Sequence, residues 1–456
     1  MKKIILSSIF CLSLYVGFAQ TNPAILNWLQ NNTIMGRHYV SGSSTAIDET
    51  VLANVQNVQY STNWVYVTTT GVPSYITGPF FGNPSLASNQ NAIFKISLKP
   101  EPDTGTLTAT TGGNIGIFIN GVALFDYRDG VAWNPTTSAL CGGPGNPPCP
   151  GGPGGSMDWN RDAIVAERGG FDCSKGHPAM GNYHHHQNPS AFNLDRVVIS
   201  TVCNLYNADG LYAIDSTIHS PLIGYAYDGY PIYGAYAFKN ADGTGGVVRM
   251  KSSYQLRAIT ARTLGPTGID VPDGPAINTT YPLGYFREDY EYVAHTGSPD
   301  YLDEHNGRFC VTPEYPAGKY CYFATVDANW NSAYPYVVGP TFYGVKNASK
   351  VTSITESTTT YTPSTSIQNN YLDKINVSVF PNPSSDLIAI QLNDLVKESI
   401  QVYLYDVLGK EVANTTINQG STIAYFDTQK LYAGEYIIKI KNSNESITKK
   451  VTVTKN

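Results

Sequence analysis

A ten-residue stretch of this chain holds four of its eight histidines, His177 and the consecutive His184, His185 and His186. In an extended segment successive side chains alternate between faces, so His184 and His186 would point one way, and Tyr183 and His185 the other. Two imidazoles on one face then lie about 7 Å apart along the strand. Because neutral imidazole is the commonest metal ligand among side chains, we predict half of a metal or substrate site here. The alternative is a polar surface run or a hydrogen-bonded structural cluster.

The remaining ligands of such a site must come from other segments. The set that we predict is His184, His186 and His219, with His305 as a fourth ligand. Two histidines from one strand and one or two from other loops are common in copper and zinc sites. These four side chains should then converge to within about 5 Å, since each ligand nitrogen lies about 2 Å from the metal ion.

Acidic residues beside these histidines extend the hypothesis. Glu304 is next to His305 and is a candidate ligand or general base, although in an extended segment it would face away from His305. Asp228 and Asp303 are candidates to orient an imidazole through its other ring nitrogen. His177 precedes a proline, and it is either a reserve ligand or a structural turn residue.

The N-terminus is typical of a secretory signal. Lys2 and Lys3 form the positive end, residues 4–18 the apolar core, and residues 17–19 a small-x-small cleavage site. The alternative of a retained anchor is disfavoured, because an apolar run of about 15 residues barely spans a bilayer. We therefore predict removal of residues 1–19 and no transmembrane helix in the mature chain.

The cysteine count agrees with export. One of the seven cysteines, Cys11, leaves with the signal, and six remain. An even number in an exported chain favours disulfides, and the absence of a Cys-x-x-Cys pair argues against a thiolate zinc site. Among the possible pairings, proximity in the sequence favours Cys141–Cys149, Cys173–Cys203 and Cys310–Cys321.

The composition favours a turn-rich β protein. Charged residues make up 14% of the chain, below the roughly 25% of typical domains, whereas tyrosine, glycine and proline are abundant. Residues 55–70 and 93–98 have strand patterns, and Asn120-Gly121 stands between two apolar runs as a hairpin signal. The formal net charge of −6 gives no electrostatic case for nucleic-acid binding.

Local signals refine this picture. Residues 23–30 are predicted to form a short helix with Asn22 as its cap, and Asp228-Gly229 to form a tight turn between two short aromatic strands. We expect a mainly β domain that is sandwich-like or barrel-like and has long loops. Residues 318–323 faintly echo the histidine segment, as a weak internal duplication would.

Composition also divides the chain into parts. After the signal, we predict one large β domain over 20–346, a Ser/Thr-rich linker over 347–373, and a small β-sandwich over 374–456. The last part has no histidine and no cysteine, and so it should carry no metal chemistry.

Three motifs in the large domain support a resemblance. The string Tyr183-His184-His185-His186, with HSPLIGYAYDGYPIYG at 219–234 and LDEHNGR at 302–308, resembles the YHYH-domain family of exported bacterial proteins. This chain departs from the family string at His185, where a tyrosine is expected. The resemblance covers roughly residues 51–343 and implies no particular activity.

The C-terminal part has its own resemblance. The strings VFPNP at 379–383, YDVLGK at 405–410, LYAGEY at 431–436 and KKV at 449–451 are similar to the sorting domain of the type IX secretion system. This implies passage across the inner membrane by the signal, and then recognition of residues 374–456 by the type IX machinery. It also implies a Bacteroidetes-type source, with release or attachment at the cell surface.

Three classes of function follow from these observations. The first is a secreted or cell-surface protein whose clustered histidines bind copper or zinc. The second is a metal-dependent or His/carboxylate-dependent extracellular enzyme, for which Glu304 would be the base. The third is a glycan-binding or adhesion module that uses exposed tyrosines.

Overall fold

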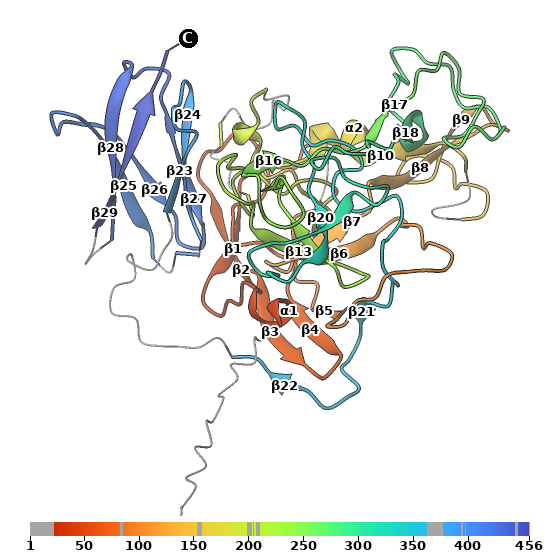
Figure 1. The fold of residues 1–456 in the computed structure, drawn as a ribbon, viewed down its shortest axis with the longest axis horizontal. Coiled ribbons are helices and arrows are strands. Elements are labelled where there is room, and N and C mark those ends of the chain that lie inside the picture. Colours follow the sequence, from red (N-terminus) through yellow and green to blue (C-terminus); the bar gives the residue numbers. More distant parts are fainter. Residues whose placement is uncertain are drawn as a thin grey trace, which may run out of the picture.

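The computed structural model of the protein describes most of residues 22–455, and the predicted signal at 1–19 lies outside the described residues. The gaps within this range are residues 83–84, 153–156, 198–202, 204, 207–209, 363–376, 394, 397 and 443–445. The fold is mainly β, as predicted (Figure 1). None of the described helices has the length and apolar character needed to cross a membrane.

An open sheet of eight short strands forms the centre of the large domain. Its strands, in spatial order, are β11 (His177–Ala179), β12 (Asn182–His185), β7 (Ala123–Phe125), β6 (Asn114–Phe118), β13 (Leu222–Ala226), β14 (Pro231–Tyr233), β20 (Lys319–Phe323) and β19 (Gly307–Cys310). Strands β6 and β13 pair antiparallel in the middle, and the β12–β7 and β14–β20 pairs are parallel.

Tight turns build the two central hairpins. Asn120-Gly121 connects β6 to β7 and Asp228-Gly229 connects β13 to β14, which confirms both turn predictions. The two glycines have φ values of 82° and 86°, a region that residues with a side chain rarely adopt.

Smaller sheets surround this centre. A five-stranded sheet has the order β21 (Ser349–Val351), β5 (Ala92–Ser97), β4 (Trp64–Thr69), β3 (Val55–Tyr60) and β22 (Thr359–Thr360). A three-stranded sheet has the order β10 (Asn160–Asp162), β8 (Arg128–Asn134) and β9 (Ala139–Cys141). The two-stranded sheets are β1 (Met35–His38) with β2 (Ile47–Leu52), β15 (Tyr236–Phe238) with β16 (Val247–Arg249), and β17 (Tyr254–Leu256) with β18 (Tyr290–Tyr292).

Within the described part of the chain, helices are few and short. They are α1 (Pro23–Leu26), α2 (Ala163–Ala166) and the 3-10 turns η1 (Arg168–Gly170), η2 (Phe192–Leu194) and η3 (Arg287–Asp289). The side chain of Asn22 accepts a hydrogen bond from the Ala24 N–H, so the predicted cap is confirmed, although α1 ends at Leu26 rather than near residue 30.

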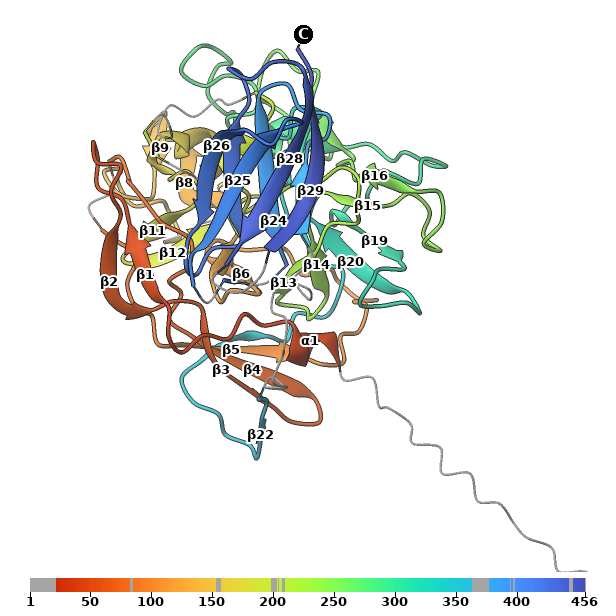
Figure 2. The same ribbon diagram turned by 90° about the vertical axis from the view of Figure 1, so that its left-hand side faces the viewer.

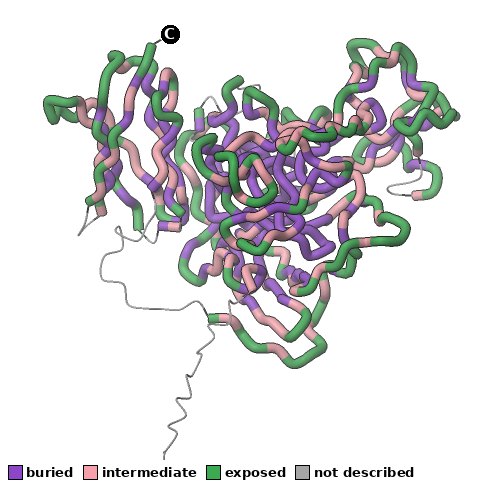
Figure 3. The backbone as a smooth tube through the Cα atoms, viewed as in Figure 1, coloured by how far each residue is buried: buried purple, intermediate pink, exposed green. Residues whose placement is uncertain are grey.

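Buried apolar and tyrosine side chains fill the interior of the large domain, whereas exposed residues lie mainly in its loops (Figure 3). Strands β21 and β22 fall in the segment predicted as a linker. They pair with β5 and β3 at the two edges of the five-stranded sheet, and the Tyr361 N–H donates to the Val58 carbonyl oxygen at 2.8 Å.

The C-terminal residues form a separate β-sandwich with its own core (Figure 1). One sheet has the order β23 (Val377–Phe380), β24 (Leu387–Leu392) and β27 (Ile423–Asp427). The other has the order β26 (Glu411–Ile417), β25 (Ile400–Asp406), β28 (Gly434–Lys441) and β29 (Ser446–Val453).

This sandwich packs against the large domain (Figures 1 and 2). Phe380 and Ile423 of the sandwich belong to the same buried cluster as the large domain's core. An Arg37 guanidinium N–H donates to the Gln419 carbonyl oxygen at 3.2 Å.

Two of the predicted disulfides are present, Cys141–Cys149 and Cys173–Cys203. The prediction of a Cys310–Cys321 bond is wrong for this structure, where both cysteines are free and buried. Cys310 pairs with Lys319 and Cys321 with Arg308, so the two cysteines are diagonal rather than opposite. Diagonal neighbours are about 7–8 Å apart, beyond the usual Cα separation of about 4.4–6.8 Å in a disulfide.

Candidate metal centre

A hairpin of two short strands brings the histidine segment together. Met180 and Gly181 form its two-residue turn with φ values of 49° and 81°, as a type I′ turn requires. With this turn, Ala179 pairs with Asn182 and His177 pairs with His184. His177 therefore lies beside the histidine run, although seven positions separate it from His184.

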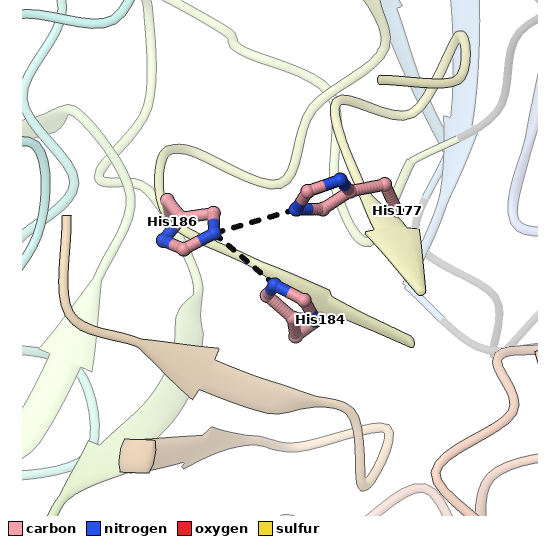
Figure 4. A group of neighbouring side chains, drawn as sticks. All are labelled: His177, His184 and His186. Carbon is pink, nitrogen blue, oxygen red and sulfur yellow. Dashed lines mark hydrogen bonds between the residues drawn. The ribbon is translucent and has the colours of Figure 1, made fainter. Parts of the chain in front are cut away.

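Three imidazoles converge on one point (Figure 4). The Nε2 atom of His186 lies 3.1 Å from Nε2 of His184 and 3.4 Å from Nε2 of His177. Ligand atoms of all three residues lie within 4.8 Å of one another, and all three side chains are buried. We call His177, His184 and His186 the histidine triad.

Contacts with the backbone fix the orientation of two rings of the triad. The Nδ1–H of His184 donates to the Asn182 carbonyl oxygen at 2.8 Å, and that of His186 donates to the Asp126 carbonyl oxygen at 2.5 Å. Phe125 stacks on His184 with a centroid separation of 3.8 Å. Since Nδ1 carries the proton in both neutral rings, both Nε2 atoms present lone pairs to the centre of the triad.

The triad is neutral near pH 7. Burial lowers the pKa of His177 to about 3 and that of His186 to about 4, and it holds the pKa of His184 well below its usual range. The charge of neighbouring imidazolium rings lowers the pKa values of His177 and His184 further. Neutral imidazole is the form that coordinates metal ions.

The other face of β12 anchors the strand. Tyr183 donates to both carboxylate oxygens of buried Asp172, at 3.1 and 2.9 Å. His185 is held by Tyr75 and Lys175, with 2.6 Å from its Nε2 to the Tyr75 hydroxyl and 3.0 Å from its Nδ1 to the Lys175 carbonyl oxygen. Tyr183 and His185 thus lie opposite the triad, as the alternation of an extended segment predicts.

Glu167 supplies a carboxylate at the triad. Its Oε2 lies 3.3 Å from Nε2 of His177 and 3.6 Å from Nε2 of His186. This oxygen is buried and has no hydrogen-bond partner among the described residues. Burial, with a contribution from the charge of Asp129, raises the pKa of Glu167 to about 8.

A cavity opens in front of these groups. It has a volume of about 490 Å³ and is lined by the triad, Glu167, Arg128 and Asp129, among others. A ligand of the size of a small organic molecule therefore has room beside the imidazoles.

The structure does not bring His219 or His305 to the triad. His219 lies near the start of β13, packs on Tyr233 and Phe238, and lines a different cavity of about 250 Å³ next to the C-terminal sandwich. The His305 ring contacts Thr341 instead, with 2.7 Å between its Nδ1 and the Thr341 Oγ1.

The predicted carboxylates also lie elsewhere. Asp228 accepts a hydrogen bond from the Tyr322 hydroxyl at 2.5 Å, and Asp303 accepts from the Tyr320 hydroxyl at 2.9 Å. Glu304 is half exposed, and its Oε1 is 3.9 Å from Nε2 of His305. In the part of the chain that the structure describes, these carboxylates contact tyrosines or His305 rather than the triad.

Two residues at the site were missed or undervalued in the sequence. The sequence predicts His177 only as a reserve ligand, and the signal that places it at the site is Gly181, whose φ permits the tight hairpin. Glu167 follows α2 and comes ten residues before His177. A lone glutamate at this position carries no motif, so only the fold reveals it.

The fold and the site together define a mainly β protein of two domains, with a buried histidine triad in the larger one. The YHYH protein family matches residues 93–335, which is more than half of the chain, so this protein belongs to that family. A secretion system C-terminal sorting domain matches residues 378–454. This match indicates a secreted or cell-surface protein that a secretion system recognises by its C-terminal domain. Both predicted resemblances are confirmed.

One curated relative matches a limited part of the chain. An endo-acting ulvan lyase of Formosa agariphila is 33% identical over 92 residues. The matched stretch is 20% of this chain and only 17% of the lyase.

Proposed function

We propose that this exported protein binds a copper or zinc ion through His177, His184 and His186. The observation that carries the proposal is the 3.1 Å separation of two Nε2 atoms, in His184 and His186, whose rings both donate from Nδ1. Two facing lone pairs repel each other unless a cation lies between or beside them. A proton is disfavoured there because burial lowers both pKa values, and a metal ion is the remaining cation.

The spacing also supports a metal ion. Ligand atoms about 2.0–2.1 Å from a tetrahedral ion are about 3.3–3.4 Å from one another. Four of the six pairs among the triad and Glu167 have separations of 3.1 to 3.6 Å. Three imidazoles with one carboxylate suit both zinc and copper. Because imidazole is the main ligand, the set favours these two metals over harder ions such as magnesium.

Metal analysis of protein purified without a histidine tag tests the proposal. Stripped protein offered zinc or copper should retain one equivalent after dialysis, and His177→Ala and His184→Ala should each weaken binding at least 100-fold. His219→Ala and His305→Ala are matched controls that remove an imidazole elsewhere and should keep full affinity. Retention of metal by the first pair of variants, or no retention by the unaltered protein, would refute the proposal.

The cavity and Glu167 favour a second candidate, a metal-dependent enzyme. A catalytic zinc keeps a position open for water and needs a base nearby. Glu167, rather than the predicted Glu304, is the carboxylate beside the triad. Cobalt substitution separates the candidates, since a four-coordinate spectrum that shifts on adding cyanide or azide indicates an exchangeable water, and an inert spectrum indicates a closed binding site.

We also propose that the C-terminal domain directs the protein that carries this site out of the cell. In this account, residues 374–456 engage the type IX secretion machinery after the signal at 1–19 is removed. Detection of the large domain in culture medium or on intact cells, and its loss from both when 374–456 are deleted, is the expected result. If the large domain still reaches the medium or the cell surface after residues 374–456 are deleted, the proposed role of these residues in export is wrong.

A further inference from the structure

The central sheet consists of two copies of one unit related by a pseudo-twofold axis. The axis passes between β6 and β13, where Ile117 pairs with Tyr225. In the first half, β6 forms a hairpin with β7, and β7 pairs in parallel with β12, the second strand of the β11–β12 hairpin. In the second half, β13 forms a hairpin with β14, and β14 pairs in parallel with β20, the second strand of the β19–β20 hairpin.

Details within the sheet repeat at equivalent positions. Gly116 and Gly224 both face the backbone across the axis, where an added Cβ would lie 2.7 Å from the Tyr225 carbonyl oxygen and 2.6 Å from that of Ile117. Phe125 packs on His186 in the first half, and Tyr233 packs on Phe323 at the matching positions in the second. The repetition is thus one of packing as well as of topology.

The loops before the outer hairpins repeat as well. In the first half, Asp172 accepts hydrogen bonds from the Gly176 N–H at 3.0 Å and from the Tyr183 hydroxyl. In the second half, Asp303 accepts from the Gly307 N–H at 3.0 Å and from the Tyr320 hydroxyl.

The residue before the glycine has a left-handed φ in both loops, 64° at Lys175 and 66° at Asn306. The faint echo in the sequence therefore corresponds to a structural duplication.

The duplication identifies the counterpart of the triad. Tyr183 corresponds to Tyr320, so His184 corresponds to Cys321 and His186 to Phe323. His177, which pairs with His184, corresponds to Arg308, which pairs with Cys321.

Cys310 lies on the same face of the second hairpin, two residues from Arg308 along β19. The second half thus presents one thiol, Cys321, at the position of His184, and a second thiol, Cys310, at the position of Ala179.

The two thiols lie on one face of adjacent strands in a buried place. Cys310 and Cys321 are both fully buried and diagonal across β19 and β20, and the Cys321 thiol donates to the Lys319 carbonyl oxygen at 3.4 Å. Their diagonal positions across β19 and β20 disfavour a direct disulfide, as described above. No further histidine, cysteine or carboxylate among the described residues completes a group of three ligand atoms within 4.8 Å at this place.

We propose that Cys310 and Cys321 form a second metal site, which binds a soft monovalent ion, Cu(I), between two thiolates. Thiolates select soft ions, and Cu(I) accepts two sulfur ligands, whereas zinc would require four ligands. Binding is a ligand exchange without electron transfer: two thiols and one Cu(I) ion give a bis-thiolate complex of charge −1 and two protons.

Cationic side chains compensate that negative charge. Arg308 and Lys319 both interact electrostatically with Cys321, and Arg308 also interacts with Cys310. β19 is the edge strand of the sheet, so Cys310 lies on the edge strand and Cys321 on the strand next to it. The site is independent of the histidine triad, and its existence does not require that the triad bind metal.

Cu(I) titration of the reduced full chain, in competition with bathocuproine disulfonate and without oxygen, tests this site. The His184→Ala protein should still bind one equivalent of Cu(I) with the ultraviolet charge-transfer band of a copper thiolate. Cys310→Ser and Cys321→Ser should each lose that equivalent and that band. Ser keeps the size of the side chain, and a urea unfolding transition like that of the unaltered protein reports that each variant is folded.

Two measurements on protein with both cysteines intact do not depend on the folding of those variants. X-ray absorption of Cu(I)-loaded His184→Ala protein should show two sulfur scatterers, and nitrogen or oxygen scatterers alone would overturn the proposal. Thiol titration of freshly exported, denatured protein should find two thiols per chain. No thiols would mean that the pair is a disulfide after export, which also overturns it.

Discussion

The Nε2 atoms of His184 and His186 face each other at 3.1 Å, while the Nδ1 atoms of the same rings are bound to backbone carbonyl oxygens. The backbone thus sets the tautomer of both rings, and β12 sets their side of the sheet. His177 then completes the group because a two-residue turn places it opposite His184. A polar surface run does not fit these observations, since the three side chains are buried.

Metal binding at pH 7 should release close to one proton, and Glu167 should be its source. Burial raises the pKa of Glu167 to about 8, so this carboxyl is mostly protonated at pH 7 in the metal-free protein. A cation beside it favours the carboxylate and expels the proton. The imidazoles contribute no proton because their pKa values lie far below 7.

Calorimetric titration with zinc in two buffers of different ionisation enthalpy measures this release. Glu167→Gln keeps the shape of the side chain and should release about one proton fewer than the unaltered protein. Glu304→Gln is the matched control at the carboxylate that lies outside the site, and it should leave the release unchanged. Equal release from the Glu167→Gln and unaltered proteins would show that Glu167 does not titrate with metal binding.

His185 should make the metal-free protein less stable in acid. Burial lowers its pKa to about 3 in the folded state, whereas an unfolded histidine has a pKa near 6.5. Between these values the unfolded state binds the extra proton, so the contribution of neutral His185 is present above pH 6.5 and is lost as the pH falls. From pH 7 to pH 5 this loss amounts to about 2 kcal/mol.

Urea unfolding of the unaltered and His185→Gln proteins at pH 7 and pH 5 checks this expectation. The stability difference between the two proteins should shrink by about 2 kcal/mol at the lower pH, because glutamine cannot titrate. A constant difference across this range would mean that His185 is already protonated in the fold or is exposed to solvent.

Sequence reasoning was most reliable where the information is local. The Asn120-Gly121 and Asp228-Gly229 turns, the Asn22 cap and the alternation along β12 all follow from short segments, and the structure confirms them. The motifs of the sorting domain are local in the same sense.

The assembly of the site could not be predicted, because it depends on pairings between distant strands. His219 precedes the aromatic strands β13 and β14, and His305 follows an acidic pair just before β19, so both lie at the second half of the sheet rather than at the triad. Proximity along the chain suggested a Cys310–Cys321 bond, whereas strand register makes the pair diagonal. Register and the pseudo-twofold axis are properties of the fold that no single segment carries.

The equivalent tyrosines of the two halves should contribute similarly to stability. Tyr183→Phe and Tyr320→Phe each remove the hydroxyl that binds a buried aspartate, Asp172 or Asp303. Leaving a buried carboxylate short of a donor costs about 1–3 kcal/mol. Thermal or urea unfolding should show this loss for both variants, with Tyr432→Phe, whose ring is exposed, as a control within about 0.5 kcal/mol of the unaltered protein. A loss in only one half would contradict the equivalence.

The two glycines at the pseudo-twofold axis provide the most direct test of the duplicated sheet. Gly116→Ala and Gly224→Ala would each place a Cβ within 2.7 Å of a carbonyl oxygen on the opposing central strand. Backbone in the middle of a sheet cannot shift as a flexible side chain can, so each variant should lose about 1–3 kcal/mol by overpacking. Gly112→Ala adds the same methyl group with nothing within 4 Å and should be neutral. If both central variants unfold at the same urea concentration as the control, β6 and β13 do not meet as described.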